Sequence, residues 1–531
     1  MKSTKIRRVF AALATSALVV STAVAIAPAA NAAVACTTTD GVETCAGTLK
    51  NGAQFAIKMP SNFQGTMFFW NHGIRTSYTL PGTPFTAPKG LEEMTPYSNS
   101  AKADVTTYML NMGYGVASYD GVSNGLRGWN TAARVEMLKE LIETSKAKYP
   151  KTARTVVYGS SMSGSILTPF AEKYPKMVDA VGIMSGVSPS LGQNLKSLCD
   201  AFYIMSVFAD PTIKGCAAFT GAGAGGLATA TAELGKVAAL LRGWQADYGA
   251  KPLAYPAALA GGPIPQRSML LLTGLLVGIP TKSPHMDGIS TGGLVPEQSI
   301  NATVAILENF AEAIGTGVLA GHSVAEVIGT GFYDNTKTDY SKLLTDADAG
   351  RYNLGLSGDD GVNAMLGVLA AAPRVTGNAA VIKKLENLDK SSFNSTKPFV
   401  LMSNEADRLV FPGNQSRLVD KMNASYKKRV AAAKGKATKP VWNVASVYAF
   451  TPVKYTQYTA TGAPDLTAAP AVSGVGHQDF TVQQMQAWVD MLAFAAEFGP
   501  LSAEEVSTFT AGTPYLNTDP GWRPSELKYN K

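Results

Sequence analysis

Short apolar runs alternate with longer helical patterns over residues 45–186 of this chain. The runs have the length and composition of strands: Ala53–Met59, Thr66–Trp70, Tyr114–Tyr119, Thr155–Tyr158 and Val178–Met184. Between them, Arg127–Tyr149 carries apolar residues at three- and four-residue steps, and Met162–Tyr174 continues directly from a strand. Strands that alternate with helices predict an α/β fold, in which helices cover both faces of a mostly parallel sheet.

The alternation stops near residue 190 and resumes near residue 395. Its second part runs Phe399–Met402 as strand, Gly413–Ala433 as helix, Val444–Phe450 as strand and Thr481–Phe498 as helix. The intervening segment holds helical apolar stretches such as Met269–Val277, and too many large apolar residues for an unfolded linker. We therefore predict an α/β domain of residues 33–189 and 396–500, a mainly helical cap of residues 190–395 inserted into it, and a C-terminal extension of residues 501–531.

The first 32 residues have the pattern of a signal peptide. Basic residues precede the apolar stretch Val9–Ala27, and Ala30-Asn31-Ala32 is a small-x-small cleavage site. This pattern predicts a secreted protein whose mature chain begins near Ala33. The pair Arg7-Arg8 fits the twin-arginine export route, but ordinary Sec signals contain such pairs too, so both routes remain open.

The charge of the mature chain is small. Removing the four basic residues of the signal lowers the formal net charge from +7 to +3. A charge this mild gives no reason to expect nucleic acid or an anionic membrane as a partner. The longest later apolar stretch, Met269–Ile279, is also too short to cross a bilayer.

Four cysteines remain in the mature chain, at positions 36, 45, 199 and 216. In an exported protein an even number of cysteines indicates disulfides, and proximity favours Cys36–Cys45 and Cys199–Cys216 among the three possible pairings. Buried free thiols and a lipid-anchored Cys36 are the alternatives. No CxxC or His/Cys cluster indicates a zinc site.

The segment Val156–Gly164 carries the strongest local signal for chemistry. A buried strand runs into small residues around Ser161, and a helix follows. Acyl transfer requires a hydroxyl at such a sharp strand-to-helix turn, and the helix start offers a free N–H, here that of Met162, to a developing oxyanion. The pattern departs from G-x-S-x-G because Ser163 stands where the second glycine is usual.

Two further loops supply a candidate acid and a candidate base. Asp407 follows the apolar strand Phe399–Met402 and precedes a hydrophobic-Pro turn, with Glu405 as its nearby competitor. His477 lies in the glycine loop Gly474–Phe480, and it is the only one of the four histidines that follows Asp407 in the chain. A general base has to serve both nucleophile and leaving group, so a loop position suits it.

At these residues the chain resembles the α/β-hydrolase superfamily, over roughly residues 45–190 and 395–500. Within it, the closest resemblance is to secreted bacterial hydrolases with a long cap. It rests on Gly113–Tyr119, Gly128-Trp129, the serine turn and Asp334–Tyr340. The resemblance implies acyl transfer without a cofactor, with Ser161 as nucleophile, His477 as base and Asp407 as the residue that orients the imidazole.

The resemblance also assigns the second oxyanion donor. Met67–Ile74 reads as a buried strand that ends in His-Gly, and in this fold that loop supplies a backbone N–H, which we assign to Ile74. His72 is then expected to orient the loop and not to act as the base.

Three functions are compatible with these patterns. The leading one is a secreted hydrolase of carboxylic esters, small or polymeric, with an apolar or aromatic group. The second is a secreted serine peptidase of the prolyl-oligopeptidase or aminopeptidase type, although the sequence has no N-terminal propeller and no clear acidic cluster for a peptide amine. The third is a non-catalytic binding protein on the same scaffold. Lipase, feruloyl or tannin esterase and polyester depolymerase are not distinguished.

Overall fold

The structure is a computed structural model, and it describes most of the chain after the predicted signal peptide. The described residues are 34–83, 85–98, 101–219, 221–246, 266–279, 296–345, 358–450, 467, 473–519 and 522–529. The predicted signal peptide, residues 1–32, lies outside this range.

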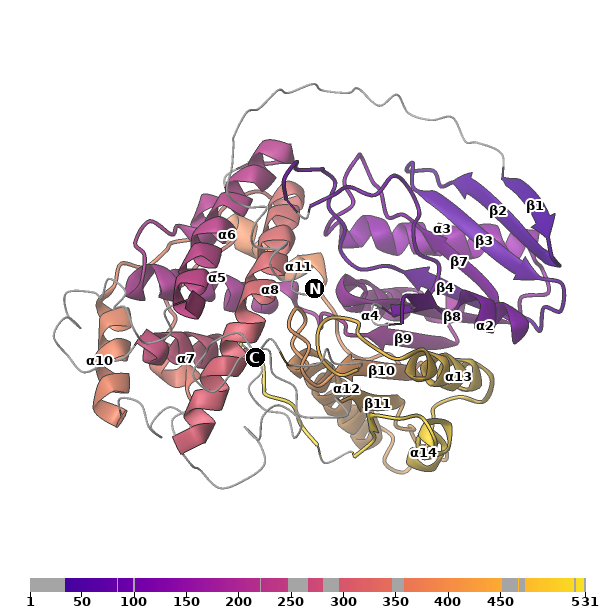
Figure 1. The fold of residues 1–531 in the computed structure, drawn as a ribbon. Coiled ribbons are helices and arrows are strands. Elements are labelled where there is room, and N and C mark those ends of the chain that lie inside the picture. The colour runs from indigo at the N-terminus through magenta and orange to yellow at the C-terminus, as the bar shows by residue number, and fades with distance from the viewer. Residues whose placement is uncertain are drawn as a thin grey trace.

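A ten-stranded sheet forms the centre of the molecule (Figure 1). Its strands in spatial order are β1 (Ala35–Thr39), β2 (Val42–Thr48), β3 (Gln54–Pro60), β7 (Gly115–Tyr119), β4 (Thr66–Asn71), β8 (Arg154–Ser160), β9 (Ala180–Met184), β10 (Phe399–Asn404), β11 (Val444–Ala449) and β12 (Leu516–Asn517). The strands from β7 to β11 run parallel, and the pairs at the two edges are antiparallel. A short hairpin of β5 (Tyr97–Ser98) and β6 (Ala103–Asp104) stands apart.

The central strands are apolar on both faces because helices cover both. In β4, Phe68 and Trp70 face one hydrophobic cluster, and Met67 and Phe69 face the other, as the two-residue period of a strand requires. One face is covered by α3 (Thr131–Lys148), α4 (Gly164–Lys173) and α12 (Gly413–Ala432), and the other by α2 (Thr106–Asn111), α13 (Val482–Phe498) and α14 (Ala503–Thr510). This architecture is the expected α/β-hydrolase fold.

The regular secondary structure described between β9 and β10 is entirely helical, with loops between the helices. Its helices are α5 (Leu191–Phe208), α6 (Gly223–Ala246), α7 (Gln266–Val277), α8 (Pro296–Ile328), α10 (Gly358–Ala371) and α11 (Ala379–Leu388). Most of them lie to the left of the sheet in Figure 1. Among the described helices of the chain, none is long and apolar enough to cross a membrane.

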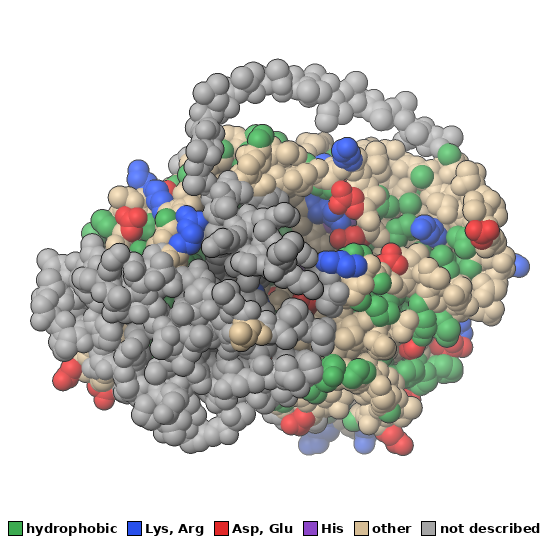
Figure 2. All heavy atoms as spheres, viewed as in Figure 1, with side chains coloured by type: hydrophobic (Ala, Val, Ile, Leu, Met, Phe, Trp, Pro, Cys, Tyr) green, Lys and Arg blue, Asp and Glu red, His purple; other side chains and the backbone are tan. Residues whose placement is uncertain are grey.

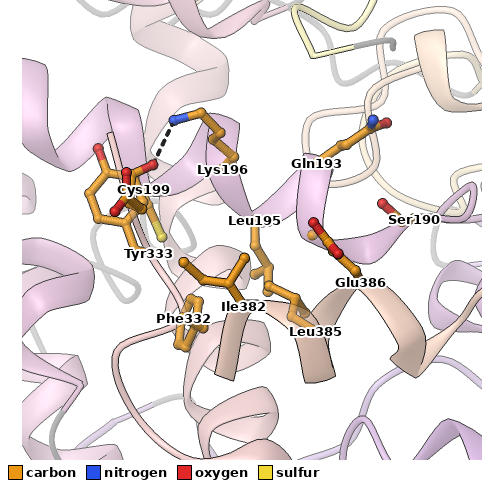
Figure 3. Close-up of a pocket in the computed structure, with 12 residues that line it drawn as sticks. Ser190, Gln193, Leu195, Lys196, Cys199, Phe332, Tyr333, Ile382, Leu385 and Glu386 are labelled. Atoms are coloured by element: carbon orange, nitrogen blue, oxygen red, sulfur yellow. Dashed lines mark hydrogen bonds between the residues drawn. The ribbon is translucent and has the colours of Figure 1, made fainter. Parts of the chain in front are cut away.

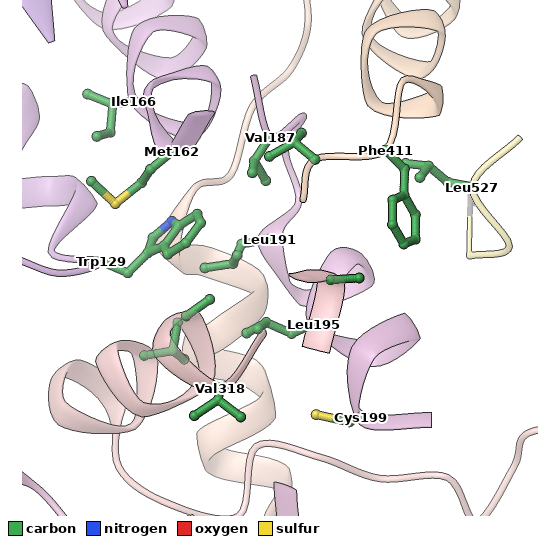
Figure 4. Packing of buried hydrophobic residues seen from close by; sticks show 14 of the residues in the cluster. Trp129, Met162, Ile166, Val187, Leu191, Leu195, Cys199, Val318, Phe411 and Leu527 are labelled. Carbon is green, nitrogen blue, oxygen red and sulfur yellow. The ribbon is translucent and has the colours of Figure 1, made fainter. Parts of the chain in front are cut away.

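The helical insertion packs directly against the α/β layers near the serine turn. Trp129, Met162, Leu191 and Val318 belong to one hydrophobic cluster that continues from the sheet into the insertion (Figure 4). The backbone N–H of Trp129 donates to Ser323 Oγ of α8 over 2.5 Å. Helix α3 begins at Thr131 and not at the predicted Arg127, and Gly128 and Trp129 before it lie against Ser323 of α8.

Both predicted disulfides are present and include all four cysteines. Cys36–Cys45 joins directly paired residues of β1 and β2, and Cys199–Cys216 joins α5 to the 3-10 turn at Gly215–Ala218. The proximity argument is therefore confirmed, and a lipid-anchored Cys36 is ruled out while its sulfur is in this bond.

The C-terminal residues complete the α/β layers and then reach the insertion. Helix α14 packs in the cluster of α13, and β12 extends the sheet beside β11. Further on, the Trp522 ring contacts Tyr448, with 4.6 Å between centroids, and the Tyr529 hydroxyl donates to the carboxylate of Asp200 in α5.

On the described part of the face in Figure 2, acidic and basic side chains are interspersed, so charge of one sign does not gather there.

Candidate active site

Ser161 stands at the sharp turn between β8 and α4. Its backbone φ is +58°, a left-handed conformation that is strained for a serine, whereas Ser160 before it is extended. A hydrogen bond of 2.8 Å from the N–H of Val187 to the carbonyl of Ser161 holds the turn. Such strain costs about 1–3 kcal/mol and persists only where the surroundings impose it. The turn therefore has the strand-to-helix geometry typical of a nucleophilic serine, although Ser161 itself is buried in this structure.

Small residues around the turn are required by close contacts. A Cβ on Gly159 would lie 2.1 Å from the carbonyl oxygen of Asn71, and one on Gly164 would lie 2.4 Å from that of Val187. Ser163 occupies the position where glycine was expected, and its hydroxyl donates to the carbonyl of Asn71 at the end of β4. The departure from the usual pattern thus ties the serine turn to the neighbouring loop.

That neighbouring loop, residues 72–74, lies against the serine. A Cβ on Gly73 would be 3.0 Å from Ser161 Cβ and 3.5 Å from its Oγ, so only glycine fits without displacement. Ile74, the predicted donor, follows directly. Met162, the other predicted donor, is the second residue of the turn Ser161–Ser163, where helix-type N–H groups lack an acceptor within the turn.

His72 is buried beneath this loop and is held there as a neutral group. Its side chain is 1% exposed, and burial, with Arg134 and Arg75 nearby, lowers its pKa well below the usual value. Its Nδ1 lies 2.8 Å from the carbonyl oxygen of Gly73, to which a neutral imidazole donates when Nδ1 carries the proton. Since this carbonyl belongs to the planar peptide that also contains the Ile74 N–H, His72 fixes the direction of that N–H.

Asp407 lies in the loop after β10 and is fully buried. One carboxylate oxygen accepts the N–H groups of Leu409 and Val410, each over 2.9 Å, and the other is 2.9 Å from Nδ1 of His477. These contacts fix the orientation of the carboxylate. Glu405, its competitor in the sequence, is also buried, and its N–H donates to Ala449 of β11.

The loop that carries His477 is joined to the Asp407 loop by backbone contacts. Ala406 and Val475 form an isolated bridge, and the Asn404 side chain donates to the carbonyl of Gly476 over 2.9 Å. Gly476 has a φ of +83°, which favours glycine. The structure therefore brings together His477 and Asp407, which are 70 residues apart in sequence.

Gln478 is a neighbour of His477 that the sequence does not reveal. Its side-chain Nε2 lies 3.2 Å from Nε2 of His477 and 3.8 Å from the position of a Cβ on Gly73. Because Nδ1 of His477 faces Asp407, the amide donates to the free lone pair on Nε2. Among the described residues, Ser161 Oγ is not a hydrogen-bond partner of His477, so Gln478 occupies that place in this structure.

The described residues that could hold a metal ion, and the residues that line the described cavity, do not include Ser161, Asp407 or His477. Within the described ranges, the one metal-like cluster is Cys36, Glu43 and Cys45, and its two sulfurs are already in a disulfide. A cavity of about 240 Å³ lies between α5, α11 and the loop at Phe332–Asp334 (Figure 3). Its lining contains Lys196 and Glu386 but not Ser161, Asp407 or His477.

Comparisons with known proteins give distant similarities. No protein-family model matches the chain, and no curated protein does either. Among solved structures, it is similar to feruloyl esterase B from Aspergillus oryzae, with 13% identity over 90% of this chain and 88% of that one and a TM-score of 0.35. It is also similar to the cell wall degrading esterase LipA from Xanthomonas oryzae, with 11% identity, coverage of 79% and 84%, and a TM-score of 0.31. Similarity of this degree identifies neither substrate nor mechanism.

Proposed function

We propose that this chain is a serine hydrolase that cleaves carboxylic esters, with Ser161, His477 and Asp407 as its catalytic triad. The observation that carries the proposal is the contact of 2.9 Å between His477 Nδ1 and the Asp407 carboxylate. With Nδ1 bound in this way, Nε2 is the basic atom. The Gln478 amide that contacts Nε2 also lies 3.8 Å from the position of a Cβ on Gly73, the residue that packs against Ser161. The strained turn at Ser161 supports the same assignment.

The proposed reaction has two halves. Ser161 Oγ attacks the ester carbonyl carbon while Nε2 of His477 takes its proton, and the carbonyl π electrons move to oxygen. The N–H groups of Ile74 and Met162 stabilise this oxyanion. Its collapse breaks the bond to the alkoxy group, which leaves as an alcohol with the proton from His477. Water, deprotonated by His477, then attacks the acyl-enzyme, and the acid and Ser161 are released.

Gln478 has to yield its position for this reaction to begin. Its amide now occupies the lone pair of His477 Nε2 that must accept the Ser161 proton. A substrate carbonyl that enters beside Gly73 competes for the same space. We therefore assign Gln478 to the resting enzyme, where it keeps the imidazole in the correct tautomer until substrate arrives.

The remaining expectations form part of the proposal. We infer that the chain is exported, which fits its two disulfides. We also infer that the helical insertion acts as a cap that limits which acyl or alcohol groups reach Ser161. The packing of Trp129, Leu191 and Val318 beside the serine turn supports this role, because it puts insertion helices next to the reacting centre.

A substrate panel tests the reaction class. We expect chromogenic esters of rising chain length to be hydrolysed with saturation, and aminoacyl and prolyl anilides to react at least about 10²-fold more slowly in kcat/KM. An alkoxide or phenoxide leaves a tetrahedral intermediate more readily than an amide nitrogen does, and within the described residues we find no feature of the site that favours a peptide. Ser161→Ala protein serves as the blank. Faster cleavage of prolyl or aminoacyl anilides would establish the peptidase instead, and no cleavage of any ester would leave a binding protein.

A further inference from the structure

Arg134 is a buried cation beside the loop that carries the proposed oxyanion donor. It lies in the first turn of α3, and its side chain is completely buried. Its guanidinium donates to the carbonyl of Arg127 over 2.7 Å and reaches the carbonyl of His72 at 3.4 Å. Gly121, with a φ of +68°, passes so close that a Cβ there would lie 2.4 Å from the guanidinium carbon.

No carboxylate neutralises this charge directly. Among the described residues, none forms an ion pair with Arg134. Asp120, which acts on Arg134 at longer range, is 3.5 Å from Arg127 and accepts two backbone N–H groups. Arg75 is a second cation whose charge acts on Arg134, and it is itself paired with Glu92 and Glu93.

The guanidinium nevertheless stays charged near neutral pH. Burial lowers the pKa of Arg134 to about 10, which is still well above that range. An unpaired buried charge destabilises a folded protein strongly. The presence of a buried arginine at position 134 therefore calls for an explanation other than the stability of the fold.

The contacts of Arg134 lead to the backbone of the oxyanion loop. The carbonyl of His72 faces both Arg134 and Ser163 Oγ, each at 3.4 Å, and the side chain of Asn71 accepts the Tyr119 hydroxyl over 2.5 Å. Because the peptide is planar, a carbonyl held on the Arg134 side fixes the plane of the peptide between His72 and Gly73. The next peptide along the chain carries the Ile74 N–H, which is the proposed oxyanion donor. Ser161 lies against Gly73.

We propose that Arg134 is a positioning residue for the oxyanion loop, and that its unneutralised charge favours the anion that forms on the substrate oxygen. The proposal rests on the serine hydrolase function proposed above and adds a charge behind the two backbone donors. Such a charge acts strongly because it is buried, away from water and mobile ions, and because it is already in place before the reaction.

Four variants separate charge from hydrogen bonding. Arg134→Lys keeps the charge, Arg134→Gln keeps a donor without the charge, and Arg134→Met removes both. Lys139→Met is the matched control, because it removes one positive charge from the exposed face of the same helix. Each variant is first shown to be folded by its thermal transition. If the Met variant does not fold, the Gln variant still measures the effect of removing the charge.

The readouts are kcat and KM for a short chromogenic ester, and the inhibition constant of an alkylboronic acid, which binds serine hydrolases as an anionic tetrahedral adduct. We expect Arg134→Gln and Arg134→Met to lower kcat by about 10- to 10²-fold, with KM changed by less than about threefold. Boronate affinity should fall in parallel, and Arg134→Lys should recover most of both losses. The effect should persist at about 0.5 M salt, because a buried charge is poorly screened.

Two results would overturn the proposal. Folded Gln and Met variants with the kcat and boronate affinity of the parent would show that the charge is not used. A Lys variant as impaired as the Met variant, both near neutral pH and at about pH 6 where a buried amine is more fully protonated, would show that only the shape of the guanidinium matters. If the parent enzyme neither hydrolyses esters nor binds the boronate, the proposed function itself fails, and this inference fails with it.

Discussion

Replacing His477 by alanine is expected to lower kcat for ester hydrolysis by about 10⁴-fold or more. The loss follows because Ser161 then has no base within reach, and because the departing alkoxide has no proton donor. Folding should survive, since His477 lies in a loop with its side chain 13% exposed, and Asp407 keeps the N–H groups of Leu409 and Val410. Steady-state kinetics and a thermal melt on the same preparation measure both.

His322→Gln is the matched control for this variant. His322 is a buried histidine of α8 whose Nε2 contacts the carbonyl of Gly223, so it is chemically similar but is held in the insertion. We expect kcat of the folded control to stay within about threefold of the parent. A His477→Ala protein that retains more than about a tenth of the parent kcat would rule out His477 as the base.

Asp407→Asn is expected to lower kcat by about 10⁴-fold while the protein remains folded. An asparagine amide at this position can donate to His477 Nδ1, which favours the tautomer with the proton on Nε2. That tautomer cannot take the proton of Ser161. The change should leave KM nearly constant, because Asp407 is buried behind His477 and does not face substrate. Kinetics on a short-chain ester measure the split between kcat and KM.

Glu405→Gln is the comparison that decides between the two acids of this loop. Both side chains are buried in the same loop, so both variants replace a buried carboxyl group by an amide of similar size. We expect the Gln variant, once shown to be folded, to keep kcat within about tenfold of the parent. The reverse order, a severe loss in Glu405→Gln and a mild one in Asp407→Asn, would move the role of the acid to Glu405.

The central strands and their order along the chain were predictable because they are buried on both faces. A run such as Thr66–Trp70 has no polar alternation, which is typical of a strand covered by helices on both faces. The hairpin of β1 and β2 was missed because β1 is entirely exposed and polar, with little apolar pattern to reveal it. Strand β12 is two residues long and depends on pairing with β11, a tertiary contact that leaves no local signal.

In the candidate site, too, residues with a local sequence signal could be proposed from the sequence, whereas residues that depend on tertiary contacts could not. Ser161, Asp407 and His477 could be proposed from the sequence because each follows a predicted strand and stands among turn-forming residues. Gln478 and Arg134 were missed because their roles depend on folded contacts. Arg134 lies in a helix whose sequence gives no reason to bury it, and only the approach of Gly121 and the carbonyl of His72 shows where its charge lies.

The account depends above all on Ser161 as the nucleophile, and covalent labelling tests that directly. The mature protein is treated with an organophosphonate that reacts with activated serines, digested, and mapped by mass spectrometry, beside a folded Ser161→Ala variant. We predict one adduct per chain, located on Ser161, and no adduct in the variant. A variant that is still labelled, at Ser160, Ser163 or elsewhere, would contradict the assignment of the nucleophile and with it the proposed mechanism.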